Sequence, residues 1–237
     1  KASKAIIMPT GTNIDTISFV FNLIEPVPDH MIFMENNGEL IPNYGITVII
    51  DASYSCFNHL SFPHSFQTIR SVLTSLKAID IQCFDLIIAT NSNPIVLCSQ
   101  LKTSYALSEK SPLWYSLFAV LQNITPSLTH SDLASAINTA FDFRRMKNIQ
   151  CSSNMIFVLT DGFYQAEERS HIIQCVNNCI QSGMITIGIG IGIYPKGIEK
   201  LFSLYVFSAD PADVMKGISD LVTDKNFDHS ETMMCNE

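Results

Sequence analysis

The sequence predicts an α/β fold: a doubly wound, mostly parallel sheet with helices on both faces and one antiparallel edge strand. Two observations predict it. Short runs of apolar, β-branched residues recur along the chain, as in Ile46–Ile50 and Met155–Leu159, and such runs are typical of buried parallel strands. Segments with helical spacing of their apolar residues separate these runs. Strands that alternate with helices form sheets of this class, joined by right-handed crossovers.

The composition allows a sizeable core and disfavours two kinds of surroundings. The chain has 237 residues, of which 47% are hydrophobic and 15% charged, and its net charge is −8. A nucleic-acid partner requires clustered Lys and Arg, and the sequence has no basic run of five residues. The apolar runs are broken by Gly, Asn or Pro well short of the ~20 residues that span a bilayer. We therefore expect neither a nucleic-acid partner nor a membrane span.

The cysteines favour an intracellular protein. There are seven, an odd number, scattered without short paired spacings, and this pattern favours reduced thiols in the cytoplasm or nucleus. Cys175 and Cys179 are four apart on a predicted helix, but no second pair or His cluster completes a zinc site. The sequon Asn123-Ile124-Thr125 leaves a secreted, adhesive alternative open. The chain begins with Lys and shows no signal-like segment, so we expect it to be part of a longer chain or complex.

Residues 1–43 do not fit a repeating unit of strand and helix. Residues 16–21 alternate like a half-buried strand, and the pattern of residues 31–41 predicts a hairpin with a turn at Asn37-Gly38. We find no chemistry in this segment. We expect three parts: an N-terminal extension, a main domain and a polar tail, over 1–43, 44–224 and 225–237.

The elements of the main domain follow from hydrophobic periodicity. Apolar runs predict strands at 46–50, 84–90, 94–98, 155–159, 184–193 and 204–208. Apolar positions three and four apart predict helices at 63–79, 112–124, 132–143, 168–182, 195–202 and 211–222. The strand at 94–98 follows its predecessor closely, so we expect it to pair with that strand as the antiparallel edge. Gly183 suits the C-terminal cap of the helix before it.

Two predicted strands end in an acid, Asp51 and Asp161. The carboxyl ends of strands are where open α/β sheets bind ligands. Ser53 and Ser55 follow the first acid, and a hydroxyl-rich loop with Ser131 enters a helix between the two strands. An all-oxygen set suits Mg²⁺, Mn²⁺ or Ca²⁺ and disfavours zinc. Two carboxylates roughly neutralise such an ion, while neutral hydroxyls leave it able to bind an acidic group from outside.

Three segments resemble the von Willebrand factor A (integrin I-like) domain, in the order and spacing of that family and over roughly residues 44–224. They are Asp51-x-Ser53-x-Ser55, Ser131-Asp132-Leu133-Ala134-Ser135-Ala136-Ile137 and Leu159-Thr160-Asp161-Gly162. In the family these segments form the metal-ion-dependent adhesion site. The resemblance implies that the hydroxyls of Ser53 and Ser55 bind the metal directly and that Asp51 and Asp161 bind it directly or through water.

Three positions depart from the family's usual residues. Ser131 stands where the family usually has Thr, which keeps a hydroxyl ligand but loosens its rotamer. Thr129-His130 replaces a frequent Gly-Gly, which makes Thr129 a reserve ligand. Cys56 follows the first motif where Ser, Met or Gly is more usual, and we treat that change as neutral.

The resemblance implies a metal-dependent protein–protein recognition module without catalytic turnover. Mg²⁺, or Mn²⁺ or Ca²⁺ in its place, would dock an Asp or Glu of a partner protein. We expect the partner to contact a rim formed by Tyr54, Thr129, His130 and Gly162. As in other members of the family, the closing helix at 211–223 is expected to shift when ligand binds.

Other functions remain open. The domain could be a scaffold of a larger multi-subunit assembly whose binding does not use the metal. A Ser–His–Asp hydrolase could draw on Ser53, Ser131 and His130, but the Gly-x-Ser-x-Gly elbow of that class is missing. Gly188-x-Gly190-x-Gly192 resembles part of a dinucleotide loop, yet it lies inside a predicted strand and lacks the final Gly. Those glycines instead predict a bare strand face against which a helix packs closely.

Overall fold

The computed structural model describes most of the main domain and three short strands before it. The described residues are 7–8, 13–14, 33–34, 44–58, 60–78, 81, 83–124, 131–145, 151, 153–192, 197–207 and 214. The described residues form two sheets. One is a small antiparallel sheet in the order β1 (Ile7–Met8), β3 (Phe33–Met34), β2 (Asn13–Ile14), and the other is a six-stranded sheet in the order β6-β5-β4-β7-β8-β9.

The six-stranded sheet confirms the predicted fold class. Its strands are β4 (Tyr44–Asp51), β5 (Cys83–Ala89), β6 (Ile95–Leu101), β7 (Ser153–Thr160), β8 (Ile185–Gly190) and β9 (Tyr205–Val206). Every neighbouring pair is parallel except β5 and β6, so β6 is the antiparallel edge strand. Apolar β-branched runs fill the central strands because both of their faces are covered.

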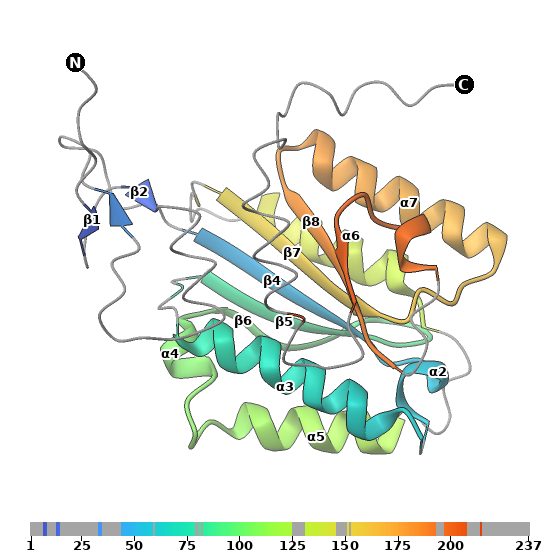
Figure 1. Cartoon of the computed structure of the whole chain (residues 1–237), viewed down its shortest axis with the longest axis horizontal. Helices are drawn as coiled ribbons and strands as arrows, with labels where there is room; N and C mark the ends of the chain where they lie inside the picture. The colour runs from blue at the N-terminus through green and yellow to red at the C-terminus, as the bar shows by residue number, and fades with distance from the viewer. Residues whose placement is uncertain are drawn as a thin grey trace.

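Helices cover both faces of this sheet (Figure 1). Their bounds are α2 (Tyr54–Phe57), α3 (Phe62–Ala78), α4 (Thr103–Ala106), α5 (Pro112–Ile124), α6 (Leu133–Arg145) and α7 (Ala166–Gln181), with a 3₁₀ turn η2 at Ile198–Lys200. Residues of α3 and α5 pack with Ile46, Val48 and Ile50 on one face. Residues of α6 and α7 pack with Ile49 on the other. Alternate residues of β4 therefore point into two separate cores, as the period of a strand requires.

The sheet order creates a crevice between β4 and β7. The chain leaves β4 toward α3 on one face and leaves β7 toward α7 on the other, so the two connections diverge. Such switch points, at the carboxyl ends of parallel strands, are where open α/β sheets bind ligands. Asp51 ends β4 and Asp161 follows β7 directly, so both acids stand at this crevice.

Three interactions fix α6, which carries the middle site segment. At its start, the backbone N–H of Asp132 donates to the carbonyl of Thr90 at 2.6 Å. At its end, Arg144 forms a buried ion pair with Asp85 of β5, with 2.6 Å between Nη2 and Oδ2. Arg144 Nε also donates to Thr47 Oγ1 of β4 at 3.0 Å. The helix is thereby joined to both neighbouring strands at the end opposite the crevice.

The other elements agree with the predictions except at their ends and in the short pieces. The sequence missed α2 and α4, each only four residues long, and predicted a longer helix where η2 stands. Phe33–Met34 forms the predicted strand but pairs with Ile7–Met8 and Asn13–Ile14. The predicted strand 16–21, the turn at Asn37-Gly38 and the polar tail lie outside the described residues, as does the helix 211–223 apart from Val214. None of the described helices combines the length and apolar composition that a bilayer crossing requires.

The bare face of β8 is packed as the glycine pattern predicts. A Cβ added at Gly188 would lie 2.5 Å from the ring of Phe202 and 3.0 Å from the side chain of Ile198. Phe202 and Ile198 are both buried, so the strand lies against the segment around η2 with no room for a methyl group.

We therefore expect Gly188→Ala to lower the free energy of unfolding by about 1–3 kcal/mol, because the added methyl overpacks the core. Urea unfolding measures the change. Combining it with Phe202→Leu should cost less than the sum of the two single changes, since the smaller side chain makes room for the methyl. Strict additivity would show that the contact with Phe202 does not restrict this position.

Candidate functional site

The carboxylate of Asp51 is the centre of the candidate site. The residue is fully buried at the end of β4. Its Oδ1 accepts the backbone N–H of Ser53 at 2.9 Å, a short-range bond that turns the chain from the strand into α2. A buried carboxylate is tolerated only when hydrogen bonds replace its lost hydration.

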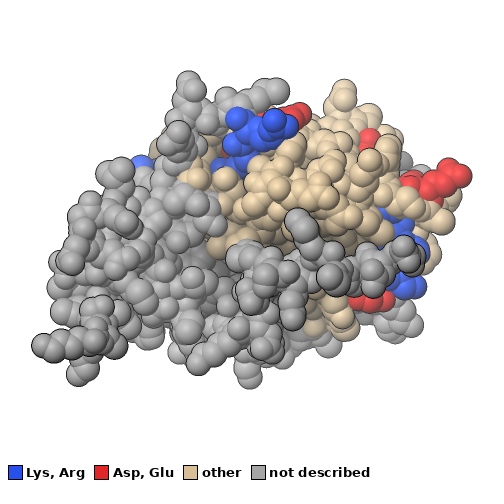
Figure 2. All heavy atoms as spheres, turned by 90° about the horizontal axis from the view of Figure 1, so that it is seen from above, with Lys and Arg blue, Asp and Glu red and all other residues tan. Residues whose placement is uncertain are grey.

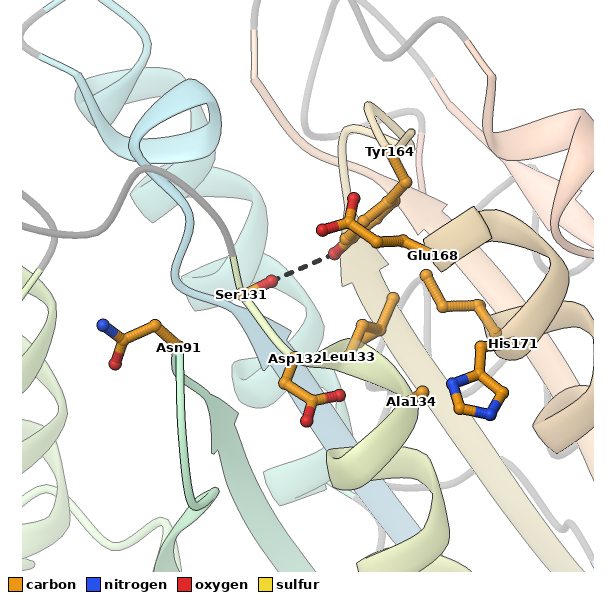
Figure 3. Close-up of a pocket in the computed structure, with 9 residues that line it drawn as sticks. Asn91, Ser131, Asp132, Leu133, Ala134, Tyr164, Glu168 and His171 are labelled. Carbon is orange, nitrogen blue, oxygen red and sulfur yellow. Dashed lines mark hydrogen bonds between the residues drawn. The ribbon is translucent and has the colours of Figure 1, made fainter. Parts of the chain in front are cut away.

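Three hydroxyl groups supply the other hydrogen bonds that replace the lost hydration of Asp51. Ser131 donates to Oδ1 of Asp51 at 2.6 Å, and Thr160 and Tyr164 each donate to Oδ2 at 2.6 Å. The hydroxyls of Ser131 and Tyr164 also lie 3.1 Å apart (Figure 3). Asp51 thus binds groups from the β4–α2 turn, the start of α6, the end of β7 and the loop before α7.

Ser53 and Ser55 place two further oxygens at the crevice. Their Oγ atoms are 3.2 Å apart. Two oxygens bound at a right angle to one Mg²⁺, each about 2.0–2.1 Å from it, lie about 3 Å from each other. The spacing of these hydroxyls therefore fits two adjacent ligands of a single ion.

Asp161 brings a second carboxylate to the same place. It is 6% exposed, and its Oδ1 accepts the backbone N–H of Phe163 at 3.0 Å. Burial and the nearby charge of Asp51 raise the pKa of Asp161. Within the part of the chain that the structure describes, no Lys or Arg pairs with either carboxylate. A divalent cation is the kind of charge that would relieve this repulsion, so the residues present fit a metal.

The structure brings the five predicted metal-site residues together. Asp51 contacts Ser131, the two serines of the first motif contact each other, and the side chain of Ser55 hydrogen bonds with Asp161. Ligand atoms of the two aspartates lie within 4.8 Å of each other. Whether these residues hold an ion stays a prediction.

Two of the four residues of the predicted rim lie among the described residues. Tyr54 is 48% exposed beside the two serines. Thr129 and His130 lie outside the described residues. Gly162 is buried, because the backbone of Gly197 and Ile198 lies directly against it. The next residue, Phe163, is 74% exposed and is the side chain that this loop presents to solvent.

Sequence reasoning missed three residues of the site. Thr160 was part of a recognised motif but had no role, and Tyr164 lay beyond the motif, where no spacing rule indicates a contact with Asp51. Burial and the charge of Asp51 raise the pKa of the Tyr164 phenol, so it stays a hydrogen-bond donor. Cys56 lies below the site, and its Sγ accepts the hydroxyl of Ser53 at 3.3 Å.

A pocket of about 180 Å³ adjoins the carboxylate cluster. Ser131 and Tyr164, which both hydrogen bond with Asp51, line it together with Glu168 and His171 of α7 (Figure 3).

Comparison with solved structures identifies the fold. The N-terminal domain of TFIIH p34 superposes with a TM-score of 0.55 at 14% identity, covering 77% of this chain and 97% of that one. Manganese-loaded TRAP protein from Plasmodium vivax gives 0.56 at 13% identity, covering 77% and 75%. The VWA domain of SpRpn10 gives 0.51 at 13% identity, covering 74% and 94%. This chain has the von Willebrand factor A fold.

Three sequence motifs resemble the von Willebrand factor A domain, and the structural comparisons support the fold. No protein-family model matches the sequence, and the search of curated proteins gives no match. Identities of 13–14% support the fold alone. What the site does must be argued from its own residues.

The hydrogen bond from Tyr164 gives a first test of the site. We expect Tyr164→Phe to lower the free energy of unfolding by about 1–3 kcal/mol, because Asp51 loses a donor to its buried charge. Tyr115→Phe is the matched control, since Tyr115 is 79% exposed. Urea unfolding of both variants without added metal measures the difference. Equal stability of the two variants would show that the Tyr164 hydroxyl does not support Asp51.

Proposed function

We propose that this chain is a protein-recognition domain that uses a divalent cation to dock an acidic residue of a partner. Asp51, Ser53, Ser55, Ser131 and Asp161 would hold the ion. The observation that carries the proposal is the meeting of two buried carboxylates and three hydroxyls at one switch point, with no basic side chain of the described residues paired to either acid.

The charges of the donor set explain why such an ion would attract an acid. Two carboxylates balance the two positive charges of the ion, and the hydroxyls add none. An oxygen-rich set of this kind suits Mg²⁺, with Mn²⁺ or Ca²⁺ as close alternatives. A hard ion that keeps an open position binds a further carboxylate, and Asp and Glu are the protein side chains that supply one.

The surface beside the site suits a protein partner. Tyr54 and Phe163 are aromatic, 48% and 74% exposed, and adjacent in sequence to site residues. Aromatic side chains are enriched in protein interfaces. On the face shown in Figure 2, Lys and Arg lie in separate small groups over the described surface and form no continuous band. That distribution favours a protein over a nucleic acid as the partner.

We also propose that the domain works inside the cell as part of a larger complex, without catalytic turnover. All six cysteines in the described part of the chain are free, which suits a reducing compartment. None of the hydrogen bonds described for Ser53 or Ser131 involves a histidine. The parts of a serine hydrolase are therefore not assembled among the described residues.

A second candidate is a scaffold whose binding ignores the metal. The observation in its favour is that Asp51 already accepts four hydrogen bonds from the protein. A carboxylate satisfied in this way stabilises the fold without any ion. In this alternative the same hydroxyls hold the loops together and the partner binds elsewhere.

Partner capture from cell extract separates the two candidates. We expect proteins captured by the immobilised chain in Mg²⁺ to be released by EDTA and to be absent with Asp51→Ala. Ser55→Ala is the milder variant, because it removes a metal ligand that is not part of the Asp51 hydrogen-bond network. Asp142→Ala, an exposed acid on α6, is the control and should capture normally. Capture that persists in EDTA and in both site variants, folded by circular dichroism, would contradict the proposal and favour the scaffold.

A further inference from the structure

Cys56 lies beside the two carboxylates of the candidate metal site. It is a residue of α2 and is fully buried. Its sulfur and a carboxylate oxygen of each of Asp51 and Asp161 all lie within 4.8 Å of one another. In the described part of the chain, this is the one group of three such side chains close enough to share an ion.

We infer that Cys56 supplies a sulfur ligand when a thiophilic divalent ion such as Zn²⁺ or Co²⁺ occupies this site, so that the site takes such ions in addition to the Mg²⁺ of the proposed function. The inference rests on the metal site of the proposed function and specifies which ions it takes. Thiolate sulfur is a soft ligand and stabilises Zn²⁺ and Co²⁺ far more than it stabilises Mg²⁺.

The distances agree with coordination by both kinds of atom. Zinc binds sulfur at about 2.3 Å and oxygen at about 2.0–2.2 Å, so two such ligands lie about 3.1 Å apart at a right angle and about 3.6 Å apart at the tetrahedral angle that zinc prefers. The observed separation of Ser53 Oγ and Cys56 Sγ is 3.3 Å. The two atoms are therefore separated by a distance that two ligands of a single ion can have. On binding, the thiol proton passes to solvent and the sulfur donates its electron pair to the ion.

The buried position also explains how one ion could be distinguished from another. Ser55 is partly exposed, whereas Ser53 and Cys56 are buried. An ion that avoids sulfur can bind the hydroxyls and carboxylates alone. An ion that prefers sulfur gains one more bond by moving inward.

Absorption spectroscopy with Co²⁺ tests this inference directly. Co²⁺ bound to a thiolate gives an intense near-ultraviolet charge-transfer band, whereas Co²⁺ bound only to oxygen does not. We expect the band on titration of the 237-residue chain with Co²⁺, and we expect its loss in Cys56→Ser and in Asp51→Ala. Cys98→Ala removes another buried cysteine and is the matched control, which should keep the band.

Calorimetry supplies the second measurement. The Zn²⁺ affinity of Cys56→Ser should fall by about tenfold or more, because losing a ligand costs at least as much as losing an outer-shell partner. Its Mg²⁺ affinity should be unchanged. This variant keeps an oxygen at the position and so separates ligand chemistry from folding.

The outcomes distinguish failure of the sulfur ligand from failure of the proposed function. Binding of Co²⁺ without the band, or a band that survives Cys56→Ser, would overturn the sulfur ligand and leave the proposed function standing. Absence of any Co²⁺ binding would overturn the inference as well. Failure of the proposed function would give a different result: partner capture would persist in EDTA and in the Asp51→Ala variant.

Discussion

The buried carboxylate of Asp51 is the interaction on which the site depends. It accepts one backbone N–H and three hydroxyls, donated by Ser53, Ser131, Thr160 and Tyr164. These donors come from three regions of the chain, at residues 53, 131 and 160–164. Hydrogen bonds to an ionised group are short and strong, and a buried charge left without them is costly. The carboxylate therefore fixes the loops at the carboxyl end of the sheet relative to one another.

The same arrangement sets what the site can do. A hydroxyl that donates a hydrogen bond to Asp51 keeps lone pairs on its oxygen, and these can bind a metal ion. Bonding to the carboxylate and bonding to an ion are therefore compatible. Asp161 adds charge that no described basic residue balances. Cys56 adds a further consideration, because a thiolate would bring a third negative charge to the ion. An ion held through sulfur would attract an acidic partner less strongly than one held by oxygen alone, and the identity of the metal would then influence partner affinity.

Much of this structure could be predicted from local patterns. The apolar runs that end at Asp51 and Asp161 predicted both the central strands and the edge of the sheet at which the candidate site lies. Helical spacing identified α3, α5, α6 and α7. These patterns can be recognised because a strand or helix that is buried on one or both faces has regularly spaced apolar residues.

The other features depend on tertiary contacts or on short elements, neither of which gives a regular spacing of apolar residues. Tyr164 lies four residues beyond the end of β7, and only the loop conformation aims its hydroxyl at Asp51. Cys56 looked like a neutral replacement because the sequence does not show that α2 directs its sulfur toward two carboxylates. The predicted rim includes Gly162, but the close approach of Gly197 buries that residue, and the exposed side chain of this loop is its neighbour Phe163. The short elements α2 and α4 contain too few residues to show a period.

Crystals soaked in Mn²⁺ offer the most direct measurement of the central claim, since anomalous scattering locates the ion without assumptions about its ligands. The account predicts one strong peak at the crevice between β4 and β7, within bonding distance of the hydroxyls of Ser53 and Ser55 and close to Asp161. A crevice without a peak at saturating Mn²⁺, with Asp51 still held by its four protein donors, would show that these residues are a structural network and not a metal site.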